Sequence, residues 1–155
     1  MINIVLYQPE IPPNTGNVAR SCAITGAKLH LIKPLGFSLS DKHLKRAGLD
    51  YWGYLDLEIH ESEQDFFLKY GDQKMYFATT KATKYYDEIE FEDNCFIVFG
   101  RETSGLPPHI HENYKDQRFK IPMRSNENLR SLNLSNSVAI VLYEALRQND
   151  FYDLK

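Results

Sequence analysis

The sequence lacks the features of membrane-spanning and secreted chains. Its longest uninterrupted apolar run covers residues 138–143, far short of the roughly 20 residues that cross a bilayer. The amino-terminal residues contain no basic stretch followed by a long apolar segment, so we expect no signal peptide. Cysteine is scarce, and Cys22 and Cys95 have neither metal-ligand spacing nor a local partner. This usage fits a reducing compartment, and we expect a cytoplasmic protein with no membrane partner.

Several common catalytic and metal-binding motifs are also missing. The chain contains no Gly-x-Gly-x-x-Gly, Gly-Lys-Ser/Thr or Gly-x-Ser-x-Gly segment, which argues against dinucleotide-binding, P-loop and serine-hydrolase classes. The five histidines include one close pair, His109-x-His111, which lacks a further set of ligands beside it. We therefore expect no metal site.

The charge of the chain is unevenly distributed. A net charge of −3 over 155 residues argues, taken as a whole, against a nucleic-acid partner. Residues 56–93, however, carry eleven acids against four bases, whereas residues 28–46 carry five bases against one acid. The basic segment is either a phosphate-binding surface or an ordinary solvated face, and charge alone leaves both open. The length is typical of one domain, and we predict a single domain over residues 1–155.

Short apolar runs alternate with helical patterns, which predicts an α/β fold. The expected strands are 2–7, 28–32, 55–59, 75–79, 95–99 and 119–121, and the expected helices are 15–25, 41–47, 62–70 and 137–148. We expect Asn14, Ser40 and Ser62 to cap the first three helices, and Ser135 or Asn136 to cap the last. The last helix is apolar around most of its circumference, at Val138, Val141, Leu142 and Leu146 among others. Such a helix is buried on more than one side, either inside the domain or in an interface between subunits.

Three polar segments follow predicted strands. They are residues 12–20, residues 100–107 and residues 131–137. In open α/β sheets, ligands gather beyond the carboxyl ends of the strands, so these segments are candidate binding loops. Each also has an ordinary structural explanation: a capped helix with a surface Arg20, a strand-to-helix turn with Pro107 starting the next helix, and a helix cap that needs only one of its polar residues.

Together, the three segments resemble the motifs of the SPOUT methyltransferase superfamily. Asn14-x-Gly16-Asn17-x-x-Arg20 resembles the first motif, and Phe99-Gly100-x-Glu102-x-x-Gly105-Leu106-Pro107 the second. Ile121-Pro122-Met123 followed by Ser131-Leu132-Asn133-Leu134-Ser135-Asn136-Ser137 resembles the third. The opening of the chain, residues 3–17, and the segment Lys45-Arg46-Ala47-Gly48-Leu49-Asp50-Tyr51 are similar to the tRNA (cytidine/uridine-34-2′-O)-methyltransferases.

The resemblance implies a fold that general rules would not propose. It implies a SPOUT-type open, mainly parallel sheet with helices on both faces and a carboxyl-terminal trefoil knot, which is rare among proteins. It further implies a homodimer that packs the last helix against its twin, and S-adenosyl-L-methionine as the cofactor. By position, the residues implied to line the cofactor pocket are Ala78, Thr79, Gly100, Glu102, Gly105, Ile121, Met123, Ser131, Leu132 and Leu134.

The implied reaction is methylation of the ribose 2′-hydroxyl of the wobble nucleotide of tRNA. The residues implied to act in catalysis are Arg20, Glu102, Asn133 and Ser135. A guanidinium stays protonated, so we favour Arg20 as an orienting and charge-stabilising group. The expected contacts with the anticodon stem-loop are Asn14, Asn17, Lys45, Arg46, Tyr51, Arg124 and Arg130.

Three alternatives remain. The chain could methylate a 2′-hydroxyl at another position of tRNA or in rRNA, or it could be an RNA-binding protein of this fold without catalysis. Methylation of a base nitrogen is disfavoured because it usually calls for a positioned carboxylate base, for which Asp50 is the one candidate.

Overall fold

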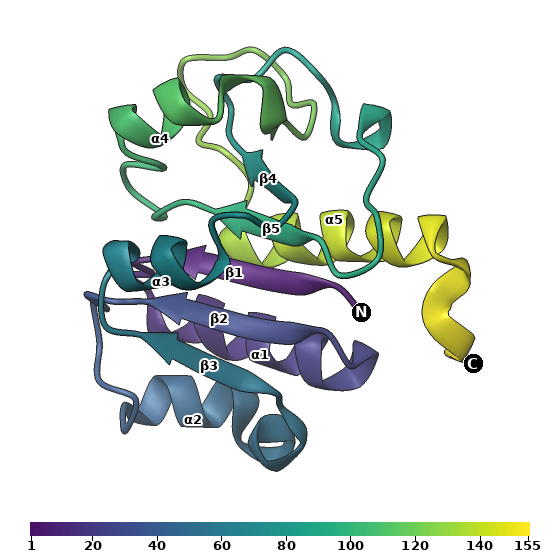
Figure 1. Cartoon of the computed structure of the whole chain (residues 1–155). Helices are drawn as coiled ribbons and strands as arrows, with labels where there is room; N and C mark the ends of the chain where they lie inside the picture. Colours follow the sequence, from purple (N-terminus) through teal and green to yellow (C-terminus); the bar gives the residue numbers. More distant parts are fainter.

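The computed structural model describes the backbone of all 155 residues and the side chains of all except residues 48 and 49. Within this backbone, the strands are β1 (Asn3–Tyr7), β2 (Lys28–Ile32), β3 (Leu57–His60), β4 (Met75–Ala78), β5 (Phe96–Phe99) and β6 (Arg118–Phe119). They form one sheet in the order β3-β2-β1-β5-β4-β6, and every neighbouring pair is parallel. The order reverses beside β1, which pairs with β2 on one side and β5 on the other (Figure 1).

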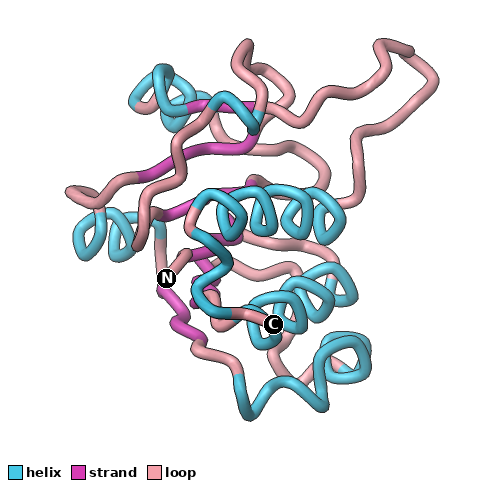
Figure 2. The backbone as a smooth tube through the Cα atoms, turned by 90° about the vertical axis from the view of Figure 1, so that its right-hand side faces the viewer, coloured by secondary structure: helices cyan, strands magenta, loops and turns pink.

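Helices cover both faces of the sheet, as the sequence predicted. The α-helices are α1 (Pro12–Thr25), α2 (Lys42–Gly48), α3 (Glu63–Tyr70), α4 (Pro108–Asn113) and α5 (Leu134–Gln148), and short 3-10 helices cover Leu49–Tyr54, Tyr86–Glu88, Lys115–Gln117 and Asp150–Asp153. One buried cluster joins α1 and α5 to one face, and a second joins α3 and α4 to the other. Both chain termini lie at the edge where the strands begin (Figure 2), so the opposite edge is left to the polar loops.

Helix ends follow local chemistry that the sequence only partly revealed. Ser62 caps α3 as predicted, its hydroxyl accepting from the backbone N–H of Asp65 at 3.1 Å. Asn14 is not the cap of α1, because the helix begins earlier, at Pro12. Proline suits this first turn, where backbone N–H groups have no partner within the helix. The cap of α5 is Asn133 rather than Ser135 or Asn136.

Gly16 allows α2 to pack closely on α1. A Cβ atom at this position would overlap the side chain of Ala47 and lie 2.9 Å from the carbonyl oxygen of Leu44. The glycine of the first polar segment is therefore explained by helix packing rather than by ligand binding.

The structure decides where the apolar residues of α5 lie, inside the domain or on its surface. Val138, Val141, Leu142 and Leu146 are fully buried in the chain's own core. Ile140 and Tyr143 are instead 37% and 48% exposed, and Ile24 of α1, the helix that packs beside α5, is 55% exposed. An apolar surface thus remains on these two helices after the domain has folded. Among the described residues, no helix combines the length and the apolar character needed to cross a membrane.

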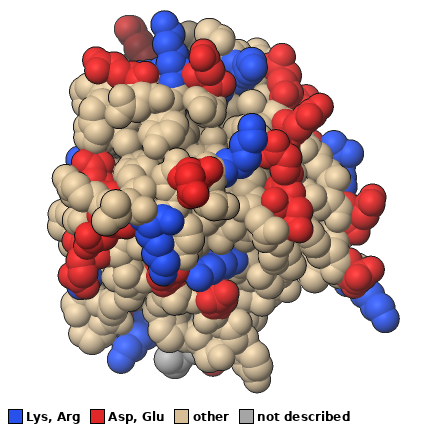
Figure 3. Space-filling model, viewed as in Figure 1, with Lys and Arg blue, Asp and Glu red and all other residues tan. Residues whose placement is uncertain are grey.

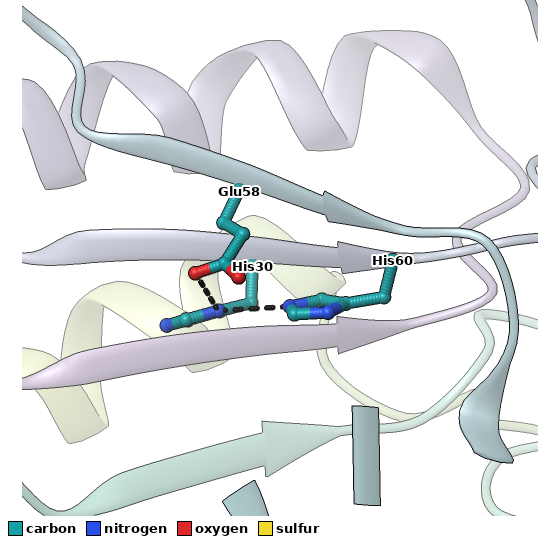
Figure 4. A group of neighbouring side chains, drawn as sticks. All are labelled: His30, Glu58 and His60. Atoms are coloured by element: carbon teal, nitrogen blue, oxygen red, sulfur yellow. Dashed lines mark hydrogen bonds and ion pairs between the residues drawn. The ribbon is translucent and has the colours of Figure 1, made fainter. Parts of the chain in front are cut away.

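A buried polar network lies under α3, where the sequence had suggested no interaction between histidines (Figure 4). His30 and His60 occupy neighbouring strands, and Nδ1 of His30 lies 3.1 Å from Nε2 of His60. Nε2 of His30 lies 3.0 Å from Oδ1 of Asn3, an amide whose nitrogen donates to the carbonyl of Asn94. His30 therefore donates to Asn3 and accepts from His60, which requires the His30 ring to be neutral.

Glu58 completes the cluster, but its oxygens are already engaged. Nδ1 of His30 lies 3.8 Å from Oε2 of Glu58. That carboxylate accepts hydrogen bonds from Lys28, Lys69 and Tyr70. Two ammonium groups beside the cluster oppose the binding of a cation, so we interpret this group as a neutral hydrogen-bonded network that anchors β2 and β3 under α3.

This network makes stability depend on pH. Burial, followed by the neighbouring His60, lowers the pKa of His30 to about 3, and burial also lowers the pKa of His60. The unfolded chain takes up these protons near pH 6.5, so it binds more protons than the folded chain at lower pH. We predict that the free energy of unfolding falls as pH drops from 6.5 to 4.5, by roughly 1.4 kcal/mol per pH unit for His30 once the unfolded state is fully protonated. His60 adds to this fall in the same direction. Urea titrations over this range measure the slope.

Matched variants separate this effect from general acid sensitivity. His30→Gln removes one titrating group. It should reduce the slope of the unfolding free energy against pH by the amount that corresponds to about one proton. His43→Gln, at an exposed position of α2, should keep the wild-type slope. Parallel slopes for His30→Gln and the wild-type protein would contradict the neutral network.

Candidate active site

The carboxyl ends of β4, β5 and β6 open into a cavity of about 560 Å³. Its walls come from the segments that follow these strands, together with Ile11 and Asn14 at the start of α1. All ten residues that the sequence assigned to the cofactor pocket line this one cavity, namely Ala78, Thr79, Gly100, Glu102, Gly105, Ile121, Met123, Ser131, Leu132 and Leu134. Their role in binding stays a prediction, but the fold does bring them together.

Hydrogen bonds tie the loop that follows β1 to the second polar segment. The backbone N–H of Glu10 donates to Oε2 of Glu102 at 2.7 Å. In return, Oε1 of Glu10 accepts from the backbone N–H of Thr103 at 3.1 Å and from its hydroxyl at 2.8 Å. These reciprocal bonds fix the loop after β5 against the loop after β1.

The carboxylate of Glu102 is only half satisfied. Its Oε1 atom is buried without a hydrogen-bond partner among the described side chains and backbone. Burial raises the pKa of this carboxyl above its ordinary value, which the backbone N–H of Glu10 opposes. Buried polar atoms nearly always have a partner in folded proteins, so a donor on a bound ligand would complete this site.

Gly100 permits the tight turn of the loop after β5. A Cβ at Gly100 would lie 2.6 Å from the carbonyl carbon of Gly105, because the loop folds back on its own start. Backbone bonds between Arg101 and Gly105 close this turn. The turn places residues 100–106 along the cavity wall.

Asn133 connects the third polar segment to the first. Its Nδ2 donates to Oδ1 of Asn14 at 2.9 Å, and its Oδ1 accepts from the backbone N–H groups of Ser135 and Asn136. The hydroxyl of Ser135 also donates to this oxygen at 2.6 Å. Asn133 and Asn14 line the cavity, whereas Ser135 lies behind Asn133 and acts on its orientation. Asn14 is buried, so its predicted contact with RNA stays a prediction.

Arg20 lies outside the cavity of its own chain. Its Nη2 donates to the hydroxyl of Tyr51 at 3.1 Å, and its guanidinium carbon lies 4.6 Å from the centre of the Tyr51 ring. Cation–π contact and hydrogen bond together hold this exposed guanidinium in one place. Tyr51, which was expected to contact the anticodon stem-loop, is thus positioned to hold Arg20.

The predicted basic segment is divided in the structure. Lys28 and Lys33 pair with Glu58 and Glu61 of the acidic stretch, at 2.9 and 3.1 Å. Lys45 and Arg46 remain exposed on α2. Figure 3 shows bases and acids intermixed over the centre of the face that carries α3, with acids gathered along the right-hand edge of that view.

The other predicted RNA contacts are exposed. Asn17 lies on the surface of α1, while Arg124 and Arg130 lie in the loop between β6 and α5. Arg130 also lines the cavity. Of the segment 45–51, the side chains at 48 and 49 lie outside the described residues.

Sequence reasoning missed several groups at the cavity. Ile11, Lys81 and His111 line it, and Glu10 supports it from behind. Lys81 follows the predicted strand 75–79 by two residues, a signal that could have placed it at the carboxyl edge of the sheet. His111 reaches the cavity from α4, a helix whose packing no sequence pattern indicated.

Comparisons with known proteins agree with this geometry. Residues 1–143 match the model of the SpoU rRNA Methylase family. A tRNA (cytidine(34)-2′-O)-methyltransferase from Methylovorus glucosotrophus is 52% identical over 152 residues, covering 97% of each chain. One from Yersinia pestis is 48% identical over 154 residues, covering 96% of this chain and 94% of that protein.

The fold comparison points the same way. A solved structure described as giving insights into 2-OH methylation of C/U34 on tRNA is 42% identical, covers 97% of both chains and superimposes with a TM-score of 0.90. An SpoU methyltransferase from Streptomyces viridochromogenes, 20% identical, shares the fold with a TM-score of 0.83. With a family match over nearly its whole length and relatives at about half identity, the chain belongs to the SpoU rRNA methylase family.

Proposed function

We propose that this protein transfers a methyl group from S-adenosyl-L-methionine to the ribose 2′-hydroxyl of nucleotide 34 of tRNA, a cytidine or a modified uridine. The observation that carries the proposal is the 52% identity, over nearly the full length, to an enzyme named for this reaction. The unpaired anticodon loop suits such an enzyme, since unpaired bases can be splayed out of their stack. A cytoplasmic location would follow from this substrate.

The cavity fits the proposed cofactor. Its volume of about 560 Å³ lies in the range of small-molecule sites. Leu106, Ile121, Leu132 and Leu134 offer apolar contacts for an adenine ring, while the backbone around Thr79 and Gly100 offers hydrogen bonds. The unpartnered Oε1 of Glu102 would accept from a ligand donor. When bound, the cofactor supplies a methyl group already activated by a positive sulfonium.

The chain's own residues must orient the ribose and stabilise the charge that develops on its oxygen. Arg20 is the group suited to this role, because Tyr51 holds its charged end in place. Asn133, fixed by Asn14 and Ser135, presents a rigid polar edge at the cavity. Since Arg20 does not line its own cavity, a second copy that brings Arg20 to the cavity of the first would complete the site.

A tRNA with one altered sugar tests the function directly. We expect purified protein and labelled cofactor to methylate tRNA, and to lose this activity when ribose 34 is replaced by its 2′-deoxy form, because the accepting oxygen is gone. Undiminished labelling of the deoxy substrate would move the reaction to another position. If unaltered tRNA drawn from cells lacking this protein is not labelled either, the non-catalytic alternative is favoured.

Arg20→Ala should reduce kcat about a hundredfold, or about 3 kcal/mol in transition-state energy. Its melting temperature and its calorimetric affinity for the cofactor should stay at wild-type values, since Arg20 is exposed and outside the cavity. Lys74→Ala, which removes an exposed cation at the start of β4, is the control for a general loss of positive charge. Turnover of Arg20→Ala within a factor of two of wild type would shift the role to Asn133.

We further propose that the exposed apolar surface of α1 and α5 forms a homodimer. Ile24, Ile140 and Tyr143 provide the apolar contacts. Ile140→Asp would bury a charge in that interface, so sedimentation velocity at micromolar concentration should show a dimer for the wild-type protein and a monomer for the variant. Leu68→Asp, at an 88% exposed position of α3 on the other face of the sheet, should remain dimeric. A monomeric wild-type protein would refute the proposal.

A further inference from the structure

A second cleft adjoins the cavity on the side of the loop between β6 and α5. Its volume is about 520 Å³, enough for one nucleotide. The residues that line both spaces are Thr80, Ile121, Met123, Arg130 and Ser131. A ligand in this cleft would therefore lie directly beside a reaction in the cavity.

The cleft is distinctly cationic in a chain of net charge −3. Lys120, Arg124 and Arg130 line it, and none of its described lining residues is acidic. None of these three cations takes part in an ion pair found among the described side chains. With no acidic side chain among the described lining residues, these cations are free to meet an anion.

An aromatic ring is fixed at the edge of the cleft. The segment around Tyr85 forms a parallel bridge with Lys120, closed by backbone bonds of 2.9 Å from Tyr86 and to Lys84. The Tyr85 ring is 44% exposed, and Nζ of Lys120 lies 5.5 Å from its centre. The bridge orders the backbone on both sides, so the ring is presented in a preset position.

We propose that this cleft binds a nucleotide next to the methylated one, with its phosphate on Arg124 and Arg130 and its base stacked on Tyr85. Phosphate oxygens suit guanidinium groups, and an aromatic ring stacks on any base without selecting its sequence. The inference rests on the proposed function and deepens it, because it says how a small domain holds the RNA strand on one side of the target sugar.

The charge of the cleft favours RNA as its ligand, rather than a part of the cofactor that extends beyond the cavity. The cations of the cavity have Glu102 beside them, whereas the cleft offers no carboxylate to the positive sulfonium and ammonium groups of the cofactor, which outweigh its one carboxylate. A polyanionic strand gains from the cations of the cleft by releasing its counterions. The cleft therefore supplies the cationic surface that the divided basic segment on β2 and α2 only partly provides.

Steady-state kinetics on the full-length protein, with tRNA as the variable substrate, test the stacking contact. Tyr85→Leu should raise KM for tRNA about tenfold while leaving kcat and the calorimetric affinity for S-adenosylmethionine unchanged, because one stacked base is lost. Tyr85→Phe keeps the aromatic face and should restore the wild-type KM.

Salt dependence tests the phosphate contact. Arg124→Ala should reduce the slope of log affinity against log salt concentration by roughly one. Lys74→Ala, at the amino end of β4 and therefore away from the cleft, should leave that slope unchanged.

The outcomes separate this inference from the proposed function. Methylation of tRNA by all variants with wild-type KM and salt slope would overturn the cleft and leave the function standing. A weakened affinity of Tyr85→Leu for S-adenosylmethionine would overturn it as well, by assigning the cleft to the cofactor. Failure of the wild-type protein to methylate any tRNA would refute the function first, and this inference with it.

Discussion

The active cavity depends on hydrogen bonds between loops that lie far apart in the chain. The backbone of Glu10 donates to Glu102 across 92 residues, and the side chain of Asn133 donates to Asn14 across 119. Each loop by itself is a short polar connection with little to fix its shape. The parallel sheet places these loops together at the carboxyl ends of its strands. A few hydrogen bonds between them then hold the walls of the cavity in place. Gly100 then allows the middle loop to fold back on its own start, where residues 100–106 line the cavity.

Much of this arrangement was accessible from the sequence, for a physical reason. The strands of a parallel sheet are buried on both faces, so they appear as continuous apolar runs, and the expected ranges agree with the observed strands within two residues at each end. The resemblance of the three polar segments to known motifs then selected the residues that line the cavity. Without that resemblance, the residues indicated only a binding loop at the end of each strand.

The contacts that the sequence could not reveal all depend on tertiary geometry. The pairing of His30 with His60 follows from the register of β2 against β3, which no single-strand pattern encodes. Tyr51 meets Arg20 because a 3-10 helix packs on α1. The apolar residues of α5 were predicted as a class, yet only packing decides that Val138 is buried and Ile140 is exposed. The trefoil knot implied by the resemblance likewise stays a prediction.

The central place of β1 has a consequence for how the chain folds as it is synthesised. Its partner β5 begins 89 residues after β1 ends, and the amino-terminal group itself is held by Asp93 and Asn94. At typical rates of translation, β5 is synthesised on the order of ten seconds after β1, so one edge of β1 stays unpaired for that time. Until then only β2 and α1 can shield it. The connectivity that assembles the cavity therefore also leaves the nascent chain prone to aggregation through this unpaired strand. The sheet can be completed only during the last third of synthesis.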